Sequence, residues 1–192
     1  QDSSTWHAQG GIAGVYSDSD SVESHVQDTV KCGAGLCHED AVRATVKHGN
    51  AIIQELIDIG TGFDVRDGKL HLTHEGGHST RRVAHAQDAT GQAITRALLS
   101  RIAPHNNIQH LEHHAAIDLI TSRCMGETGS KQCLGAYVLS ADNEILTVRA
   151  GRTILATGGA GKVYLYTSNP HAASGDGIAM AYRAGATIAN ME

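Results

Sequence analysis

The chain has 192 residues, 41% of them hydrophobic, and a formal net charge of -5. That length suffices for one sizeable core, or for one domain with a smaller lobe. The acidic balance, with no basic cluster interleaved with aromatic residues, argues against nucleic acid as the main partner. No apolar stretch approaches the roughly eighteen residues of a membrane span.

The first half of the chain is predicted to hold two helices and a hairpin. Apolar residues at helical spacing follow Ser19, and the Ser and Asp residues there can cap that helix. A second apolar stripe covers residues 39–59 and stops before a glycine, as is typical of a helix C-terminus. Residues 61–73 then predict a hairpin around Asp67-Gly68, a pair that suits a type I′ turn.

The second half is predicted to hold helices at its two ends and short strands between them. Apolar spacing indicates the helices, and β-rich runs bounded by turn residues indicate the strands. In chain order we expect a helix from 89 to about Pro104, strands at 108–112, 116–121, 134–139 and 145–149, turns at 126–130 and Asp142-Asn143, an apolar β run at 153–157, and a helix from 174 through Ala184. This order predicts an α/β body with an inserted helical and hairpin lobe at about residues 39–90.

The cysteines and histidines do not predict a metal site. The four cysteines have neither a Cys-x-x-Cys pair nor zinc spacing, so we expect reduced thiols in a cytosol-like compartment; they are Cys32, Cys37, Cys124 and Cys133. Four histidines crowd one segment, where we expect solvated side chains at a connection and a strand edge; they are His105, His110, His113 and His114. The chain starts without Met and stops after an apolar stretch, so we expect an internal piece of a longer protein.

Residues 71–82 have the composition of a site for a small charged substrate. One acidic residue, Glu75, lies among three histidines and two arginines beside Gly76-Gly77, where backbone can approach a ligand closely. The carboxylate can accept a hydrogen bond from a substrate ammonium, while neighbouring cations can hold substrate carboxylates. The alternative is a polar surface turn with an N-cap.

Three glycine-bearing blocks separate extended segments from helical or turn regions. They are Gln9-Gly10-Gly11, residues 156–159 and residues 174–177. Backbone N–H groups there can reach a phosphate or a flat ring without interference from a Cβ, and Asp176 can bind a ribityl or ribose hydroxyl or cap the helix. Each block alone also fits an ordinary turn. Neither a Gly-x-Gly-x-x-Gly nor a Walker-type motif occurs in the sequence.

Together the blocks resemble the succinate dehydrogenase and fumarate reductase flavoprotein superfamily. Residues 4–13, Ser-Thr-Trp-His-Ala-Gln-Gly-Gly-Ile-Ala, resemble its flavin-contacting segment, and residues 153–159 resemble its strand that returns to the FAD domain. Residues 167–170 followed by 174–177 resemble its flavin-binding Asp loop. The resemblance covers essentially the whole chain and is greatest to the L-aspartate oxidase family.

This resemblance implies a partial FAD-binding, Rossmann-like α/β domain with an inserted α+β substrate or capping lobe. Residues 1–38 and 91–192 would belong to the FAD-binding domain, truncated before the main capping domain, and residues 39–90 would lie near the substrate site. The residues implied to contact FAD are Ser4, Thr5, Trp6, His7, Ala8, Gln9, Gly10, Gly11, Ala115, Ala116, Thr157, Gly158 and Asp176.

Two positions separate the branches of the superfamily. Succinate dehydrogenases of membrane complexes carry covalent FAD on a histidine five residues before the Gln of the Ala-Gln-Gly-Gly block, where this chain has Ser4. His7 is three residues too late, so non-covalent FAD is expected. Glu75 matches the glutamate of the Glu-Gly-Gly-His-Ser motif, where dicarboxylate-only relatives have glutamine. The resemblance implies that Glu75 orients the substrate amino group; Arg81 and Arg82 could equally form salt bridges within the lobe.

The resemblance further implies that the full protein oxidises L-aspartate to iminoaspartate, with oxygen or fumarate reoxidising the flavin. The product feeds quinolinate and NAD synthesis, which makes quinolinate synthase an expected partner, in the cytoplasm or in a plastid of a plant or alga. The family's Gly-rich loop lies upstream of this chain, and its substrate-binding histidine and proton-transferring arginine lie downstream, so we expect no turnover by this piece alone. Alternatives are a fumarate reductase or succinate dehydrogenase flavoprotein, and a non-catalytic module with a flavoprotein core.

Overall fold

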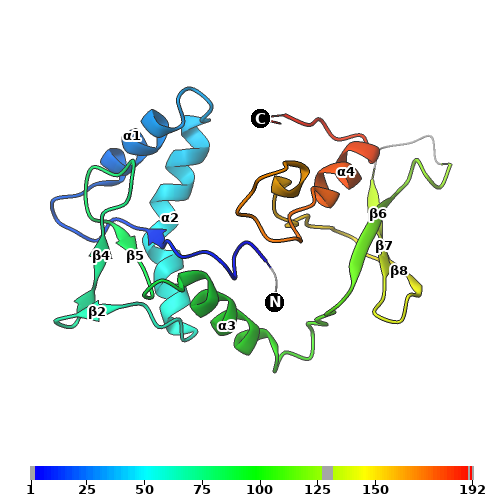
Figure 1. Cartoon of the computed structure of the whole chain (residues 1–192), viewed down its shortest axis with the longest axis horizontal. Helices are drawn as coiled ribbons and strands as arrows, with labels where there is room; N and C mark the ends of the chain where they lie inside the picture. The colour runs from blue at the N-terminus through cyan, green and yellow to red at the C-terminus, as the bar shows by residue number, and fades with distance from the viewer. Residues whose placement is uncertain (1–2, 127–131, 190, 192) are drawn as a thin grey trace. The chain divides into compact units, whose positions relative to one another are not determined.

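The computed structural model describes residues 3–126, 132–189 and 191, and the chain divides into two compact units (Figure 1). Unit 1 is Thr5–Ile108, and unit 2 runs from Gln109 onward together with the short segment that ends at Ser4. Each unit has its own helices and its own antiparallel sheet.

Unit 1 combines three helices, a small sheet and a hairpin. The helices are α1 (Val22–Cys32), α2 (Glu39–Asp58) and α3 (Thr90–Ile102). The sheet has the antiparallel order β1-β5-β4, with β1 (Ile12–Ala13), β5 (Val83–Ala84) and β4 (Leu72–Thr73). The hairpin consists of β2 (Val65–Arg66) and β3 (Lys69–Leu70). Strand β5 thus lies between the segment after the first glycine block and the segment before Glu75.

The helices of unit 1 form where the sequence predicts them. Ser21 caps α1 by accepting a hydrogen bond at its Oγ from the Ser24 amide, 3.0 Å away. The apolar stripe of α2 places Ile53 and Leu56 in a core shared with Phe63 of the following loop and Ala84 of β5. Burying each large aliphatic side chain stabilises the fold by roughly 1.5–3 kcal/mol. The core therefore fixes α2 against the central strand of the sheet.

The predicted hairpin is confirmed. Asp67 and Gly68 have φ angles of +52° and +75°, which is the left-handed pair that a type I′ turn requires. Val65 pairs with Leu70 across the turn, and the His71 amide donates to the Asp64 carbonyl at 2.8 Å. The dipeptide Asp-Gly therefore sets the register of this hairpin.

Unit 2 is built on a three-stranded antiparallel sheet in the order β6-β7-β8. The strands are β6 (Ala115–Thr121), β7 (Cys133–Leu139) and β8 (Ile145–Arg149). Helix α4 (Asp176–Arg183) is tied to β6, because Arg183 Nε donates to Asp118 Oδ2 at 2.9 Å and Arg183 Nη2 donates to the Ile117 carbonyl at 3.1 Å. A short 3-10 turn, η1 (Gly161–Val163), precedes it.

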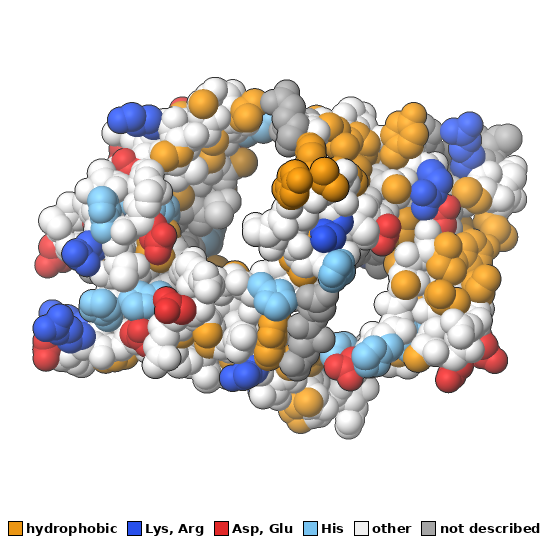
Figure 2. Space-filling model, viewed as in Figure 1, with side chains coloured by type: hydrophobic (Ala, Val, Ile, Leu, Met, Phe, Trp, Pro, Cys, Tyr) orange, Lys and Arg blue, Asp and Glu red, His pale blue; other side chains and the backbone are white. Residues whose placement is uncertain are grey.

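Much of the sheet's apolar surface is exposed. Figure 2 shows orange hydrophobic side chains gathered over this unit. The exposed large hydrophobic side chains on its strands are Ile117, Tyr137, Ile145 and Val148. The sheet of unit 2 therefore presents apolar side chains that nothing in the described part of unit 2 covers.

Two predicted strands are wrong. Residues 108–112 form no strand, and Ile108 is 48% exposed, because no neighbouring backbone pairs with this connection. Residues 153–157 also have no strand partner within the described residues, and Ile154 is 90% exposed. An apolar run predicts a buried strand only where flanking strands complete the hydrogen-bond ladder. The turn predicted at 126–130 begins at Gly126, with φ of +79°, and its remainder lies outside the described residues.

Within the described ranges, no helix is long and apolar enough to cross a membrane. The same residues contain no group of three or more His, Cys, Asp or Glu side chains that could hold a metal ion. Of the crowded histidines, His105, His110 and His113 are exposed and His114 is partly exposed. All four cysteines are free thiols.

Candidate functional site: an acidic turn braced by an ion cluster

Glu75 lies on an exposed turn between β4 and β5. The His78 amide donates to the Glu75 carbonyl at 3.2 Å, and Gly77 has a φ of +86°, a left-handed conformation that favours glycine. The space around Gly76 is open, with no atom within 4 Å of where a Cβ would stand. The Glu75 side chain is exposed, and its carboxylate has no hydrogen-bond or ion-pair partner in the described part of the chain. It is therefore available to a ligand.

The turn ends in a buried cluster of charges, which we call the ion cluster: Arg82, Asp20 and Asp28. The Arg82 side chain is 0% exposed, and it donates to Asp20 through Nε at 2.9 Å and through Nη2 at 2.8 Å. Its Nη1 donates to Asp28 Oδ2 at 2.7 Å. The fork of the guanidinium matches one carboxylate with two bonds and reaches the second with its remaining arm. Arg82 is thus a structural cation rather than an exposed clamp.

Asp28 also holds the backbone of the turn. Its Oδ2 accepts from the Ser79 amide at 2.7 Å and from the Ser79 hydroxyl at 2.8 Å. Burial alone raises the pKa of Asp28, but the hydrogen bonds from Ser79 and Arg82 outweigh burial and lower the pKa to about 2. The pKa of Asp20 is lowered in the same way, with burial opposed by Arg82. Both groups therefore remain anionic at neutral pH.

Two histidines stand beside the cluster. Arg82 Nη1 lies 3.3 Å from His78 Nδ1. The His25 ring meets the His78 ring edge-on, with centroids 5.4 Å apart. Burial, and then the charge of Arg82, lower the pKa of His25. The buried positive charge at this end of the turn is that of Arg82.

The first glycine block packs against α3 and β5. The Gly91 amide donates to the Ala8 carbonyl at 3.0 Å, and Trp6 stacks under the Arg96 guanidinium, 5.3 Å from the ring centroid. At Gly11 a Cβ would stand 2.1 Å from the Ala84 carbonyl oxygen. Of the predicted FAD contacts in this block, Trp6 is half-buried, whereas Thr5, His7, Ala8, Gln9, Gly10 and Gly11 are exposed.

Gly91 should not tolerate a side chain. A Cβ there would stand 1.7 Å from the Thr5 carbonyl oxygen, so we expect Gly91→Ala to displace the 5–8 turn and to destabilise the protein by about 1–3 kcal/mol. The measurement is thermal melting of the full-length protein. Gly62→Ala is the matched control, because the space beside Gly62 is open. Equal melting temperatures for the two variants would contradict the packing argument.

Unit 2 brings two of its predicted FAD-contacting blocks together. The Gly175 amide donates to the Gly159 carbonyl at 3.2 Å, and a Cβ on Gly177 would stand 1.7 Å from Thr157 Oγ1. Asp176 is the first residue of α4, with Ser174 Oγ donating to its Oδ2 at 2.8 Å. Gly158 has a φ of +72° and open space around it. Exposed backbone, a hydroxyl and a carboxylate thus share one location, and this set fits a polyhydroxylated or phosphorylated cofactor.

The remaining predicted FAD contacts are Ala115, Ala116 and Ser4. Ala115 and Ala116 begin β6, are exposed and pair with Leu139 and Val138. Ser4 is exposed and belongs to unit 2. Their roles toward a cofactor stay predictions, as do those of the other residues implied by resemblance.

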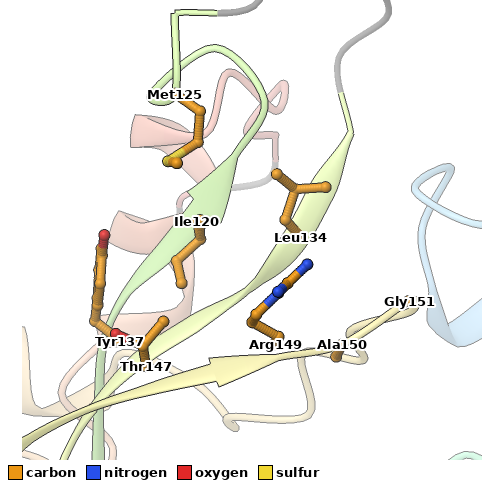
Figure 3. A pocket seen from close by; sticks show the side chains of 8 residues that line it. All are labelled: Ile120, Met125, Leu134, Tyr137, Thr147, Arg149, Ala150 and Gly151. Atoms are coloured by element: carbon orange, nitrogen blue, oxygen red, sulfur yellow. The ribbon is translucent and has the colours of Figure 1, made fainter.

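A separate hollow of about 910 Å³ lies on the sheet of unit 2. Figure 3 shows its lining side chains, among them Ile120, Met125, Tyr137 and Arg149, drawn from β6, β7, β8 and the segment after β6. None of the predicted site residues lines it. Its lining mixes apolar side chains with the polar ones of Tyr137, Thr147 and Arg149, and its size alone does not make this hollow the functional site.

Sequence reasoning missed the bracing of the turn. The sequence leaves open whether Arg82 binds substrate or forms a salt bridge. In the structure Arg82 forms salt bridges with Asp20 and Asp28 in the ion cluster. The roles of Asp20 and Ser79 were not predicted. Asp20 lies 62 positions before Arg82, so no local spacing pattern connects them. The sequence predicts the Ser and Asp residues before α1 only as helix caps.

Comparison with known proteins extends over the whole chain. The FAD binding domain family matches residues 1–192. An L-aspartate oxidase of Pseudomonas aeruginosa is 54% identical across 98% of this chain and 37% of that protein. An L-aspartate oxidase of Vibrio cholerae is 51% identical across 98% and 36%, and a chloroplastic one of Nicotiana tabacum is 47% identical across 100% and 30%. The chain thus spans about a third of the length of these curated relatives.

Solved structures also match this chain over most of its length. A quinol fumarate reductase of E. coli has a TM-score of 0.86 and 32% identity, covering 94% of this chain and 30% of that chain. Sdh1 of Mycobacterium smegmatis has a TM-score of 0.86 and 27% identity, covering 95% and 32%. The predicted α/β fold of an FAD-binding domain is therefore confirmed.

Proposed function

Because the chain belongs to the FAD binding domain family, we propose that it forms part of a flavoprotein oxidase that converts L-aspartate to iminoaspartate. The observation that carries this proposal is the exposed, unpaired carboxylate of Glu75 on a Gly-Gly turn. Identities of about one half to L-aspartate oxidases over nearly the whole chain support it. An anionic side chain suits a substrate ammonium, whereas it disfavours a plain dicarboxylate.

The residues of the glycine blocks fit FAD. We propose that backbone amides at Gly10, Gly11 and Gly158 approach the cofactor, and that Thr157 and Asp176 bind its hydroxyl groups. When bound, FAD accepts the hydride that leaves the substrate Cα. The role of this chain's Glu75 is to accept a hydrogen bond from the substrate ammonium and so to orient the Cα–H bond. Residues 1–38 and 91–192 would then serve the FAD-binding domain and residues 39–90 the substrate side.

We propose that the flavin is held without a covalent bond. Ser4 occupies the position at which covalent relatives have histidine, and a hydroxyl cannot form the imidazole linkage. Oxygen or fumarate would reoxidise the flavin, and quinolinate synthase would consume the product on the route to NAD. The compartment would be the cytoplasm, or a plastid as in the chloroplastic relative of Nicotiana tabacum.

The full-length protein provides the test. We expect a yellow protein whose flavin is released into the supernatant by acid precipitation, and which forms hydrogen peroxide from L-aspartate much faster than from D-aspartate. Flavin that stays in the pellet would contradict non-covalent binding. A colourless preparation that cannot be reconstituted with FAD would favour the non-catalytic module.

A fumarate reductase or succinate dehydrogenase flavoprotein is the second candidate. The structural similarity to the quinol fumarate reductase of E. coli, at a TM-score of 0.86, favours it. Both readings share fold and cofactor, so substrate decides between them. Succinate oxidation by the full-length protein at a rate equal to or above that for L-aspartate would support the second candidate over the first.

A further inference from the structure

Helix α1 contacts the Glu75 turn at three successive positions along one face. Ser24 Oγ lies 3.3 Å from Ser79 Oγ, Asp28 Oδ2 accepts from the Ser79 amide at 2.7 Å, and Cys32 Sγ lies 3.6 Å from the Gly77 carbonyl. The positions are four residues apart, which is the spacing of one helix face. The turn therefore packs along one face of helix α1.

Of these contacts, the one at Asp28 is the strongest. A single oxygen, Oδ2, accepts three hydrogen bonds: from the Ser79 amide, the Ser79 hydroxyl and Arg82 Nη1. Charge-assisted bonds of this kind are stronger than neutral ones. Arg82 is itself held by Asp20 with two bonds. Asp28 thus ties the backbone four residues after Glu75 to the buried ion cluster.

The constraint that Asp28 places on the Ser79 backbone reaches Glu75 through contacts within the turn. The His78 amide donates to the Glu75 carbonyl, and His74 Nε2 contacts the His78 carbonyl. The Gly76-Gly77 step alone has wide conformational freedom, so the turn needs an external brace to keep one geometry. Misplacement of an orienting group by about 1 Å can cost about a hundredfold in rate.

We propose that Asp28 is a positioning residue that fixes the Glu75 turn and thereby sets the preference for substrates that carry an ammonium group. The inference rests on the proposed function, since it acts only through Glu75. Asp28 is not placed against substrate. The Ser79 hydroxyl and amide are the groups through which it acts.

A double-mutant cycle in the full-length enzyme tests this. We expect Asp28→Asn to lower kcat/KM for L-aspartate by about tenfold in the parent, but by less than about twofold when Glu75→Gln is already present, because two groups that act as one unit are not additive. The change in melting temperature caused by Asp28→Asn should be the same in both backgrounds. Asp58→Asn, an exposed α2 residue whose side chain accepts a hydrogen bond from Gln54 on its own helix, is the matched control and should change neither value.

Ser79→Ala is the second variant, for use where Asp28→Asn does not fold. It removes the exposed hydroxyl bond and keeps the backbone bond, so we expect a smaller loss of about threefold with the same dependence on Glu75. Equal losses in the two backgrounds would overturn the inference and leave Asp28 a merely structural residue. If Glu75→Gln alone does not affect L-aspartate oxidation, the proposed role of Glu75 fails and the inference fails with it.

Discussion

Glu75→Gln is expected to lower kcat/KM for L-aspartate by about 10- to 100-fold. A hydrogen bond to a charged group contributes about 1.5–3 kcal/mol, and the variant loses this contribution. The carboxamide keeps the shape and one acceptor oxygen, but it loses the negative charge that complements the ammonium. The side chain is exposed and unpaired, so folding should be unaffected. Steady-state kinetics with L-aspartate, beside a melting curve, measures both effects.

The specificity of this effect is checked in two ways. Activity with fumarate or succinate as the tested dicarboxylate should not fall and should rise, because neither compound has an ammonium for Glu75 to bind and the negative charge of Glu75 disfavours a plain dicarboxylate. Glu55→Gln, an exposed glutamate on α2, should leave every rate unchanged. A Glu75→Gln enzyme with unaltered kinetics for L-aspartate would remove the main support for an amino-acid substrate.

Arg82→Met is expected to destabilise the protein by about 3–5 kcal/mol, because it leaves the carboxylates of Asp20 and Asp28 without their buried partner. The Asp20 side chain is 0% exposed and cannot turn to water without opening the structure around it. The lower melting temperature and soluble yield of the full-length protein report the loss. A methionine side chain has a similar length to that of arginine. The loss of stability therefore reports the missing charge rather than a cavity.

Arg43→Met is the matched comparison. Arg43 also pairs with two acidic residues, Glu23 and Glu39, but all three side chains are more than two fifths exposed. Exposed pairs contribute little because water screens the two charges, so this variant should melt close to the parent. If both arginine variants lowered the melting temperature equally, burial would not be what makes the ion cluster important.

The elements that the sequence predicted well are those set by local chemistry. The stripe of α2, the Ser21 cap of α1 and the Asp67-Gly68 turn each depend on residues a few positions apart. The alternating strands β6, β7 and β8 pair with their neighbours in sequence, so short-range patterns were enough. These are cases in which propensity and tertiary contacts agree.

The elements that the sequence did not predict depend on distant partners. Residues 108–112 and 153–157 have the composition of strands, but a strand exists only where another backbone accepts its hydrogen bonds. Arg82 and Arg81 are adjacent and chemically identical, yet one is buried and the other exposed. Only the fold, by placing Asp20 and Asp28 beside one of them, decides which arginine is structural.

The sequence motif predicts the substrate-facing residue of the candidate site, Glu75. It does not predict the residues that hold the Glu75 turn in place. Glu75 stands out because it is the one acid in a basic, glycine-containing segment. Asp28 is one of many aspartates, and nothing in its neighbourhood indicates that it accepts a bond from an amide 51 positions later. Hydrogen bonds between side chains and remote backbone have no sequence signature.

The long separation within the ion cluster also has a consequence for how the protein is made. Asp20 precedes Arg82 by 62 positions, and at about 5–20 residues per second a ribosome needs about 3–12 seconds to cover that distance. During this interval α1 and α2 are synthesised, but the two carboxylates lack the cation that allows them to be buried. The ion cluster can therefore form only after Arg82 has been synthesised, and its formation closes a loop that spans those 62 positions.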